Sequence, residues 1–175
     1  LFIDDFENAK KIFIKCLNQN SFDYSILNNI LYCFDSIGDS QRTIQYLNDF
    51  LEKNPYSEIA WHQLGKQYAN DKMYEEALSA FDFAIISDDS FVGAYLEMAK
   101  ILEKLNRINE AIEKYEISIG INQPTSFALF RIGRCHYKLG NDDLALSYFI
   151  QTIEEDPIHD KAWMSIAVHY FNKKD

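Results

Sequence analysis

The amino-acid sequence predicts an all-α fold, a helical solenoid built from helix-turn-helix repeats of about 34 residues each. Three observations support this prediction. Large and small apolar residues recur along the 175-residue chain at a fixed period of 34. Within each period the apolar residues are spaced three, four and seven apart, as they are on one face of a helix. The chain also has only six glycines and three prolines, which argues against a β-rich or disordered chain.

Residues 58–91 carry the repeat most clearly. They read as two amphipathic helices joined by a short turn, and a shift by one period in either direction aligns them with similar residues. The small residues Gly65 and Ala77 let the two helices approach closely, so that neighbouring aromatic rings fill the flanks of the crossing. The aligned positions are Trp61, Leu64, Gly65 and Tyr68 on the first helix and Ala77, Phe81 and Ala84 on the second, with later counterparts that include Trp163, Gly133, Ala111, Ala145, Tyr115 and Phe149.

The repeats are predicted to follow one another in a single array over residues 1–175. Residues 1–23 read as the second half of a repeat, because Ala9, Phe13 and Cys16 fall in the phase of the second helix. Natural arrays finish with polar caps, whereas both ends here divide a repeat. We therefore expect a longer array, or ends that another subunit protects. Full repeats are predicted at residues 24–57, 58–91, 92–125 and 126–159, and residues 160–175 form the first helix of a further repeat.

Turn and capping residues lie at the expected joints of the array. Prolines such as Pro55 and Pro157 end the second helices, because proline cannot continue a helix. Three hydroxyl side chains, Ser57, Ser90 and Thr125, are placed to cap the helices that follow. Turns within the repeats are predicted at Gly38-Asp39, Asn70-Asp71, Asn106-Arg107 and Gly140-Asn141.

The spacing W-x2-L-G-x2-Y, followed by A-x3-F, resembles that of the tetratricopeptide repeat family. Residues 58–91 match this pattern almost completely, except that Asp89 stands where the family has a closing proline. The resemblance covers nearly the whole chain. It implies a right-handed α–α superhelix, in which the first helices of successive repeats line a concave groove that binds peptides.

The resemblance also indicates which residues face that groove. Lys66, Lys100 and Arg134 are equivalent, each one repeat period after the last, which predicts a row of basic side chains. We hypothesise that the groove binds an extended peptide with acidic groups and one or two apolar anchors. The alternative is that these residues are solvated charges on helix faces, some of them paired with Glu97 and Glu103. The predicted peptide-binding residues are His62, Lys66, Leu96, Lys100, Phe130, Arg131, Arg134 and Lys138.

Composition excludes several other classes of function. A net charge of −10 disfavours nucleic acid as a partner, because phosphate binding needs a basic surface. No apolar run is long enough to span a membrane. No phosphate-binding loop, dinucleotide fingerprint or metal-binding H-E-x-x-H motif is present, so we expect no enzyme, cofactor or metal site.

The three cysteines are read as unpaired. Cys33 and Cys135 occupy equivalent positions in their repeats, where a small buried residue fits, and Cys16 is far from both. This spacing argues against a disulfide or a metal site and favours core packing. Unpaired cysteines and the absence of a visible leader favour a cytoplasmic location.

The resulting hypothesis is a non-enzymatic protein–protein interaction scaffold that binds a peptide or protein segment in its groove. One alternative is a regulatory or recruiting segment of a larger enzyme or signalling protein. Another is a self-assembly module, in which copies join end to end through their incomplete repeats. An RNA-binding helical repeat is disfavoured, because the chain is acidic and has no continuous basic groove.

Overall fold

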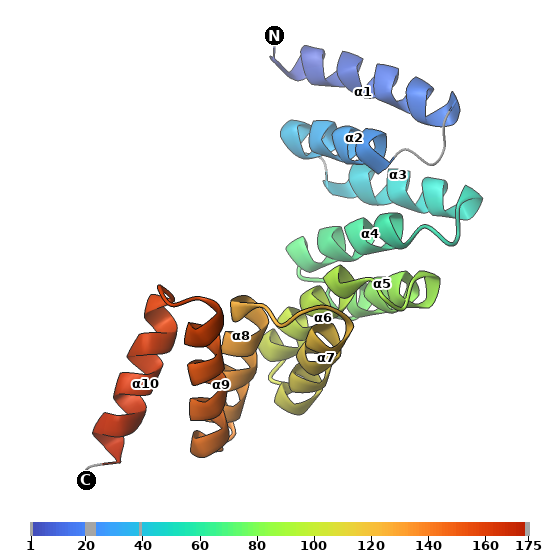
Figure 1. The fold of residues 1–175 in the computed structure, drawn as a ribbon. Coiled ribbons are helices and arrows are strands. Elements are labelled where there is room, and N and C mark those ends of the chain that lie inside the picture. The colour runs from blue at the N-terminus through green and yellow to red at the C-terminus, as the bar shows by residue number, and fades with distance from the viewer. Residues whose placement is uncertain (1, 20–23, 39, 174–175) are drawn as a thin grey trace. The chain divides into compact units, whose positions relative to one another are not determined.

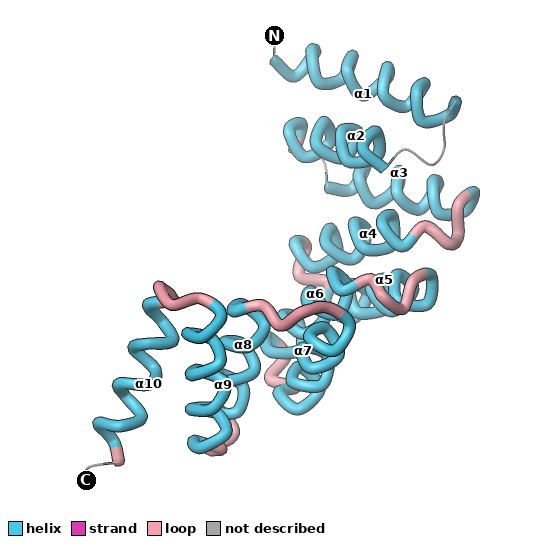
Figure 2. The backbone as a smooth tube through the Cα atoms, viewed as in Figure 1, coloured by secondary structure: helices cyan, strands magenta, loops and turns pink. Residues whose placement is uncertain are grey.

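The computed structural model describes residues 2–19, 24–38 and 40–173, which fold into ten α-helices without any strand (Figure 2). The prediction of an all-α helical-repeat fold is confirmed. Asp39, one of the predicted turn residues, lies outside the described residues. The helices are α1 (Phe2–Gln19), α2 (Tyr24–Ile37), α3 (Ser40–Lys53), α4 (Glu58–Asn70), α5 (Tyr74–Ser87), α6 (Val92–Lys104), α7 (Ile108–Ile121), α8 (Ser126–Lys138), α9 (Asp142–Glu155) and α10 (Asp160–Asn172).

The chain divides into two compact units, Leu1–Asp89 and Ser90–Asp175. The first unit contains α1 to α5 and the second contains α6 to α10 (Figure 1). Within each unit, helices that follow one another in the chain pack against one another. The most extensive packing joins α4 to α5, α6 to α7 and α8 to α9, which are the helix pairs within residues 58–91, 92–125 and 126–159.

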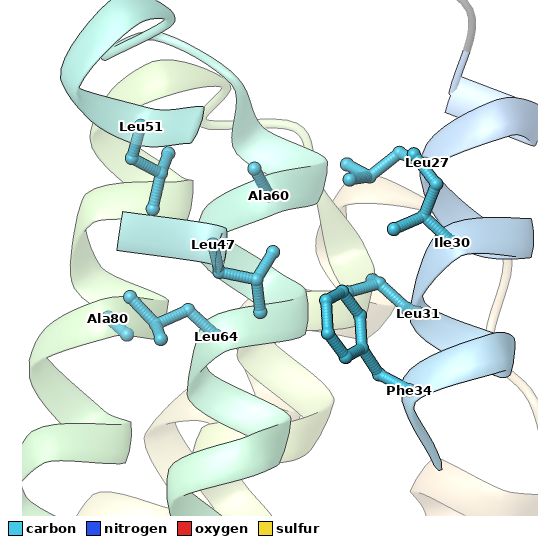
Figure 3. Close-up of a cluster of buried hydrophobic side chains, with 9 residues drawn as sticks. All are labelled: Leu27, Ile30, Leu31, Phe34, Leu47, Leu51, Ala60, Leu64 and Ala80. Carbon is cyan, nitrogen blue, oxygen red and sulfur yellow. The ribbon is translucent and has the colours of Figure 1, made fainter. Parts of the chain in front are cut away.

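The core of the first unit is a cluster of aliphatic and aromatic side chains between α2, α3, α4 and α5. Leu27 and Ile30 of α2 are fully buried, as is Leu47 of α3. In Figure 3 the α2 side chains point toward those of α3 and α4, so that one apolar face of each helix is removed from water. The cluster consists of Leu27, Ile30, Leu31, Phe34, Leu47, Leu51, Ala60, Leu64 and Ala80.

Two of the closely packed helix pairs are held by a ring that lies against a glycine. A Cβ atom added to Gly65 would come within 2.6 Å of the Phe81 ring, so α4 and α5 can approach this closely only because position 65 is glycine. The second unit repeats the arrangement, since a Cβ atom on Gly133 would lie 2.8 Å from the Phe149 ring. Both contacts agree with the close approach that the sequence predicts.

The N-terminal caps recur at one position in the repeats. Ser57 and Thr125 accept hydrogen bonds from the amides of Ala60 and Ala128, and His159 accepts one from Ala162 through its Nδ1 atom. The predicted cap Ser90 is wrong. The residue one period after Ser57 is Phe91, which caps α6 without a side-chain hydrogen bond.

Helix α1 departs from the predicted phase of a second helix. Phe13 and Ile14 pack against the core of the first unit, and the Lys10 ammonium lies 4.6 Å from the centre of the Phe34 ring. Cys16 is exposed, although its predicted phase would bury it. The reason is that α1 turns Lys10, Phe13 and Ile14 toward α2, which leaves Cys16 on the solvent side.

The turn within each repeat contains one residue in the left-handed backbone region. These residues are Gly38, Lys72, Asn106 and Gly140, again one period apart, with φ angles of 76°, 62°, 59° and 75°. Glycine adopts this region without a steric penalty and asparagine tolerates it, whereas lysine has a Cβ atom that crowds the backbone. The strained residue is therefore Lys72, which lies beyond the predicted Asn70-Asp71 turn.

We expect Lys72→Gly to raise the free energy of unfolding by roughly 0.5–1 kcal/mol, because the relief of left-handed strain exceeds the entropy that glycine adds to the unfolded chain. Lys72 is exposed, so the change removes no core packing. Urea unfolding followed by circular dichroism measures the difference. Gly140→Ala is the matched control and should lower stability, because it adds a Cβ atom at the equivalent position. A loss of stability in Lys72→Gly would contradict the strain explanation.

Candidate peptide-binding groove

A cavity of about 660 Å³ opens between α8 and α10, with α9 behind it. The lining side chains are spaced three and four residues apart on each helix, so each helix turns a single face toward the cavity. We call this cavity the α8–α10 groove. Its lining residues are Phe130, Arg134, Tyr137 and Lys138 from α8, Phe149 from α9, and Asp160, Lys161, Met164, Ser165 and Val168 from α10.

The floor of the groove is apolar and rigidly supported. Phe130 is buried, and its ring centre lies 5.7 Å from that of Phe149 and 4.7 Å from that of His159. Met164 lies on the opposite wall and is 68% exposed, so its flexible side chain is available to an incoming apolar group. A supported aromatic floor beside a mobile thioether suits one apolar anchor of a bound segment.

The rim of the groove is basic. Arg134, Lys138 and Lys161 contribute three positive charges against one negative charge from Asp160, although the chain as a whole carries a net charge of −10. Among the described residues, neither Arg134 nor Lys161 makes an ion pair, and both are exposed. Their charges are therefore available to a ligand.

Arg131, predicted to bind the ligand, is instead part of a polar cluster inside the second unit. Its guanidinium Nε lies 2.7 Å from Oε1 of Glu103, and its terminal nitrogen lies 2.6 Å from the same oxygen. Glu103 belongs to α6 and is only 7% exposed. A buried carboxylate needs such partners, because desolvation is costly for an unpaired charge. Arg131 thus neutralises Glu103 and does not line the groove.

A hydroxyl donor and an ammonium group complete the cluster around Glu103. The Tyr115 hydroxyl donates to Oε1 of Glu103 over 2.9 Å, and the Lys138 ammonium lies 3.8 Å from Oε2. Burial first, and then the charge of Glu103, raises the pKa of Tyr115 above its usual value, so the hydroxyl keeps its proton. The Glu103 carboxylate of α6 therefore contacts side chains of both α7 and α8. Lys138 contacts this cluster and also lines the groove.

Burial governs the neighbouring thiol as well. Cys135 is fully buried, and desolvation, aided by the charge of Glu103, raises its pKa to about 11. A thiol with this pKa is protonated at neutral pH and is a poor nucleophile. Its environment agrees with the packing role that its place in the repeat indicates.

Two other predicted site residues lie on α6 and do not line the groove. Lys100 forms an ion pair with Glu97, with 2.6 Å between Nζ and Oε1, and its ammonium lies 5.9 Å from the centre of the Phe127 ring. Leu96 is half-buried. The alternative interpretation, in which some basic residues are paired with Glu97 and Glu103, therefore describes the geometry of Lys100 and Arg131.

The remaining predicted residues, His62 and Lys66, lie on α4 in the first unit. The His62 ring packs against Phe81, with 5.6 Å between ring centres. Lys66 is exposed and makes no ion pair with any described residue. Of the eight predicted residues, the groove brings together Phe130, Arg134 and Lys138.

The site residues predicted from the sequence include none of the five that form the α10 wall. The repeat period could have indicated two of these residues. Met164 lies one period after Phe130, and Val168 lies one period after Arg134. The row of basic residues therefore ends in valine on α10, and the positive charge comes from Lys161, nearer the start of that helix. The other missed residues are Tyr137, Phe149, Asp160 and Ser165.

Neither a metal-binding cluster nor a membrane-spanning helix occurs in the described part of the chain. No three histidine, cysteine, aspartate or glutamate side chains there come together in a way that could hold a metal ion. No helix in this part is both long enough and apolar enough to cross a membrane.

Comparison with protein-family models identifies two repeats. Residues 92–124 and residues 127–157 each match a model described as a tetratricopeptide repeat. Among solved structures, MamA superimposes with a TM-score of 0.75 at 24% identity, covering 90% of this chain and 92% of that one. YrrB, described as a TPR protein with an unusual peptide-binding site, has a TM-score of 0.74 at 25% identity, covering 93% and 84%.

Curated relatives match over little of their own length. A peroxisomal targeting signal receptor of Candida glabrata is 31% identical over 102 residues, which are 58% of this chain and 17% of the receptor. Superkiller complex protein 3 of Mus musculus is 28% identical over 103 residues, which are 59% of this chain and 7% of that protein. With its regular repeat period, its ring-on-glycine helix pairs and these matches, the chain belongs to the tetratricopeptide repeat family.

Proposed function

We propose that this chain is a non-catalytic scaffold that binds a segment of a partner protein, and that the α8–α10 groove holds carboxylates of that segment beside one apolar side chain. Tetratricopeptide repeats are a protein-interaction fold, and the names of two similar proteins refer to a peptide-binding site and to a targeting signal. The observation that carries the proposal is the joining of Arg134 and Lys161 to an apolar floor in one cavity of an acidic chain.

The chemistry of the groove defines the expected ligand. The guanidinium of Arg134 can hold a carboxylate through two parallel hydrogen bonds, and the Lys161 ammonium adds a second positive charge. An apolar side chain placed between the two acids would cover Phe130 and contact Met164. Because exposed charges contribute mainly to orientation and association rate, binding should weaken as salt concentration rises.

A synthetic peptide tests this function directly. The probe is a fluorescein-labelled decapeptide of aspartate and glutamate with one central leucine, and its control has serine in place of leucine. Fluorescence anisotropy should show binding of the leucine peptide. The wild-type chain should bind the serine control with a Kd about tenfold or more above that for the leucine peptide. The double variant Arg134→Glu/Lys161→Glu should show a similar rise in Kd for the leucine peptide. The matched control Lys114→Glu reverses a charge on α7, outside the groove, and should leave Kd unchanged.

The two groove substitutions change exposed residues, so circular dichroism melts of the variants should match the wild type. Equal affinity of the wild type and Arg134→Glu/Lys161→Glu would exclude the groove as the binding site. Loss of binding in Lys114→Glu as well would show that the chain attracts the probe only through its overall charge.

A recruiting segment of a larger enzyme or signalling protein is the second candidate. The observation that favours it is that this chain matches only 17% and 7% of the length of its curated relatives. In that case the groove would capture a substrate or regulator for chemistry performed elsewhere in the polypeptide. The peptide experiment supports groove binding under either candidate, and the activity of the full-length protein with and without Arg134→Glu/Lys161→Glu distinguishes them.

A further inference from the structure

Lys138 belongs both to the α8–α10 groove and to the buried cluster around Glu103. Its side chain is 41% exposed and lines the groove one helical turn after Arg134, while its ammonium lies 3.8 Å from Oε2 of Glu103. The other two basic side chains of the groove, Arg134 and Lys161, make no ion pair with any residue that the structure describes. Lys138 therefore differs from them, because a carboxylate of the chain itself competes with a ligand for its charge.

The contact between Lys138 and Glu103 is loose. A distance of 3.8 Å between Nζ and Oε2 is longer than a hydrogen bond. In contrast, Oε1 of Glu103 lies 2.7 Å and 2.6 Å from two nitrogens of Arg131 and accepts from the Tyr115 hydroxyl over 2.9 Å. The charge of Arg131 by itself balances that of Glu103. Lys138 can therefore turn toward a ligand without leaving a buried carboxylate unpaired.

Glu103 nevertheless attracts the Lys138 ammonium. The side chain of Glu103 is only 4% exposed, so water and salt screen its charge less than they screen an exposed carboxylate. A ligand carboxylate must draw the ammonium away from Glu103 before the two groups can reach hydrogen-bond distance. The attraction to Glu103 thus opposes the binding of an anion beside Lys138.

We propose that Glu103 is a positioning residue of the groove, which competes with the ligand for Lys138 and thereby sets the affinity for an anionic segment. This inference rests on the proposed function of the α8–α10 groove. Because Glu103 lies on α6 and its donor Tyr115 lies on α7, the competition links ligand affinity to the packing of these two helices on α8. A stronger hold of α7 on Glu103 leaves Lys138 more available to the ligand.

Two substitutions in the cluster should change affinity in opposite directions. Glu103→Gln keeps an acceptor for the Tyr115 hydroxyl and removes the competing charge, so Kd for the leucine decapeptide should fall about three- to fivefold. Tyr115→Phe removes one donor from Glu103 at nearly constant volume, so the carboxylate depends more on Lys138 and Kd should rise about twofold. Fluorescence anisotropy measures both changes.

Both effects should act through Lys138. In chains that also carry Lys138→Met, Tyr115→Phe should leave Kd unchanged, and Glu103→Gln should lower it far less than in the wild-type background. The matched control is Glu97→Gln, which changes the net charge by the same amount on the same helix, outside the groove. This control should bind the leucine decapeptide with the wild-type Kd.

The outcomes separate this inference from the function on which it rests. An equal shift by Glu103→Gln with and without Lys138→Met would overturn the inference, because the effect would then come from overall charge. Weaker binding by both Glu103→Gln and Tyr115→Phe would also overturn it, since the cluster would then support only the fold. In either case the wild type still binds the peptide, and the proposed function stands. Absence of binding by the wild type would refute the function and the inference together.

Circular dichroism melts of each variant establish that it is folded before its affinity is compared. Tyr115→Phe keeps the ring in the core and retains both charges of the Glu103–Arg131 pair. If Glu103→Gln did not fold, Tyr115→Phe with and without Lys138→Met would decide the question. An unchanged Kd in Tyr115→Phe would then contradict the inference.

Discussion

Replacement of Trp61 by alanine is expected to lower the free energy of unfolding by about 3 kcal/mol, the lower end of the range for large aromatic residues in a core, because Trp61 is only half-buried. The Trp61 ring stacks on Phe83, and its indole Nε1 donates to the carbonyl of Pro55 over 2.8 Å. Alanine removes the stacked area and leaves a cavity in the α4–α5 pair. Urea unfolding of the variant, followed by circular dichroism, measures the loss.

The chain contains a matched control for this substitution. Trp163 occupies the same place in its repeat and donates to the carbonyl of Pro157 over 2.9 Å, but it is 51% exposed. Trp163→Ala should therefore cost less than about 1 kcal/mol. Equal losses in the two variants would show that the shared indole hydrogen bond, and not the ring stack, carries the energy.

Replacement of Glu103 by alanine is expected to cost about 3–5 kcal/mol, a range typical of breaking a buried ion pair by removing one partner. The substitution leaves Arg131 without its carboxylate and leaves the buried Tyr115 hydroxyl without its acceptor. The side chain of Arg131 is 24% exposed, so water recovers part of its solvation, and the lower end of the range is expected. Urea unfolding again measures the change.

Two controls separate charge burial from simple loss of a glutamate. Glu97→Ala, on the same helix, breaks the more exposed pair with Lys100 and should cost less than about 1 kcal/mol. The double variant Glu103→Met/Arg131→Met removes both charges and should recover most of the stability that Glu103→Ala loses. If Glu103→Ala were no more damaging than Glu97→Ala, the cluster would not contribute as a buried network.

Much of the helix architecture could be predicted because it depends on spacing. Gly65 and Phe81 lie in repeat phase, and the structure places the ring directly over the glycine. Ser57 and Thr125 cap helices as their residue types indicate. Ser90 does not cap α6, although its residue type suits a cap, because the capping position of the repeat falls one residue later, on Phe91. Lys72 was not predicted as a turn residue, because lysine rarely adopts a left-handed backbone conformation. Its position in the repeat, equivalent to Gly38 and Gly140, does indicate that conformation.

The candidate groove was predicted only in part. Phe130 and Arg134 were found through equivalence to earlier repeats, and both line the cavity. Arg131 lies only three residues before Arg134 on α8, yet it forms an ion pair with Glu103 of α6 and does not line the groove. Spacing along one helix cannot show this difference, because it depends on which neighbouring helix carries a carboxylate at the right height.

The residue pattern alone was enough to specify the helical-repeat fold, the family and the phase of most repeats. The reason is that apolar residues at a regular period mark the face of each helix that is buried on folding. The packed helices, in contrast, were needed to show which charges remain available. Arg131 forms an ion pair with Glu103, and Lys100 forms one with Glu97. Arg134 and Lys161 stay exposed on the rim of the α8–α10 groove. The physical reason is that an ion pair depends on distance and burial across helices, which residues far apart in the chain establish only when they pack.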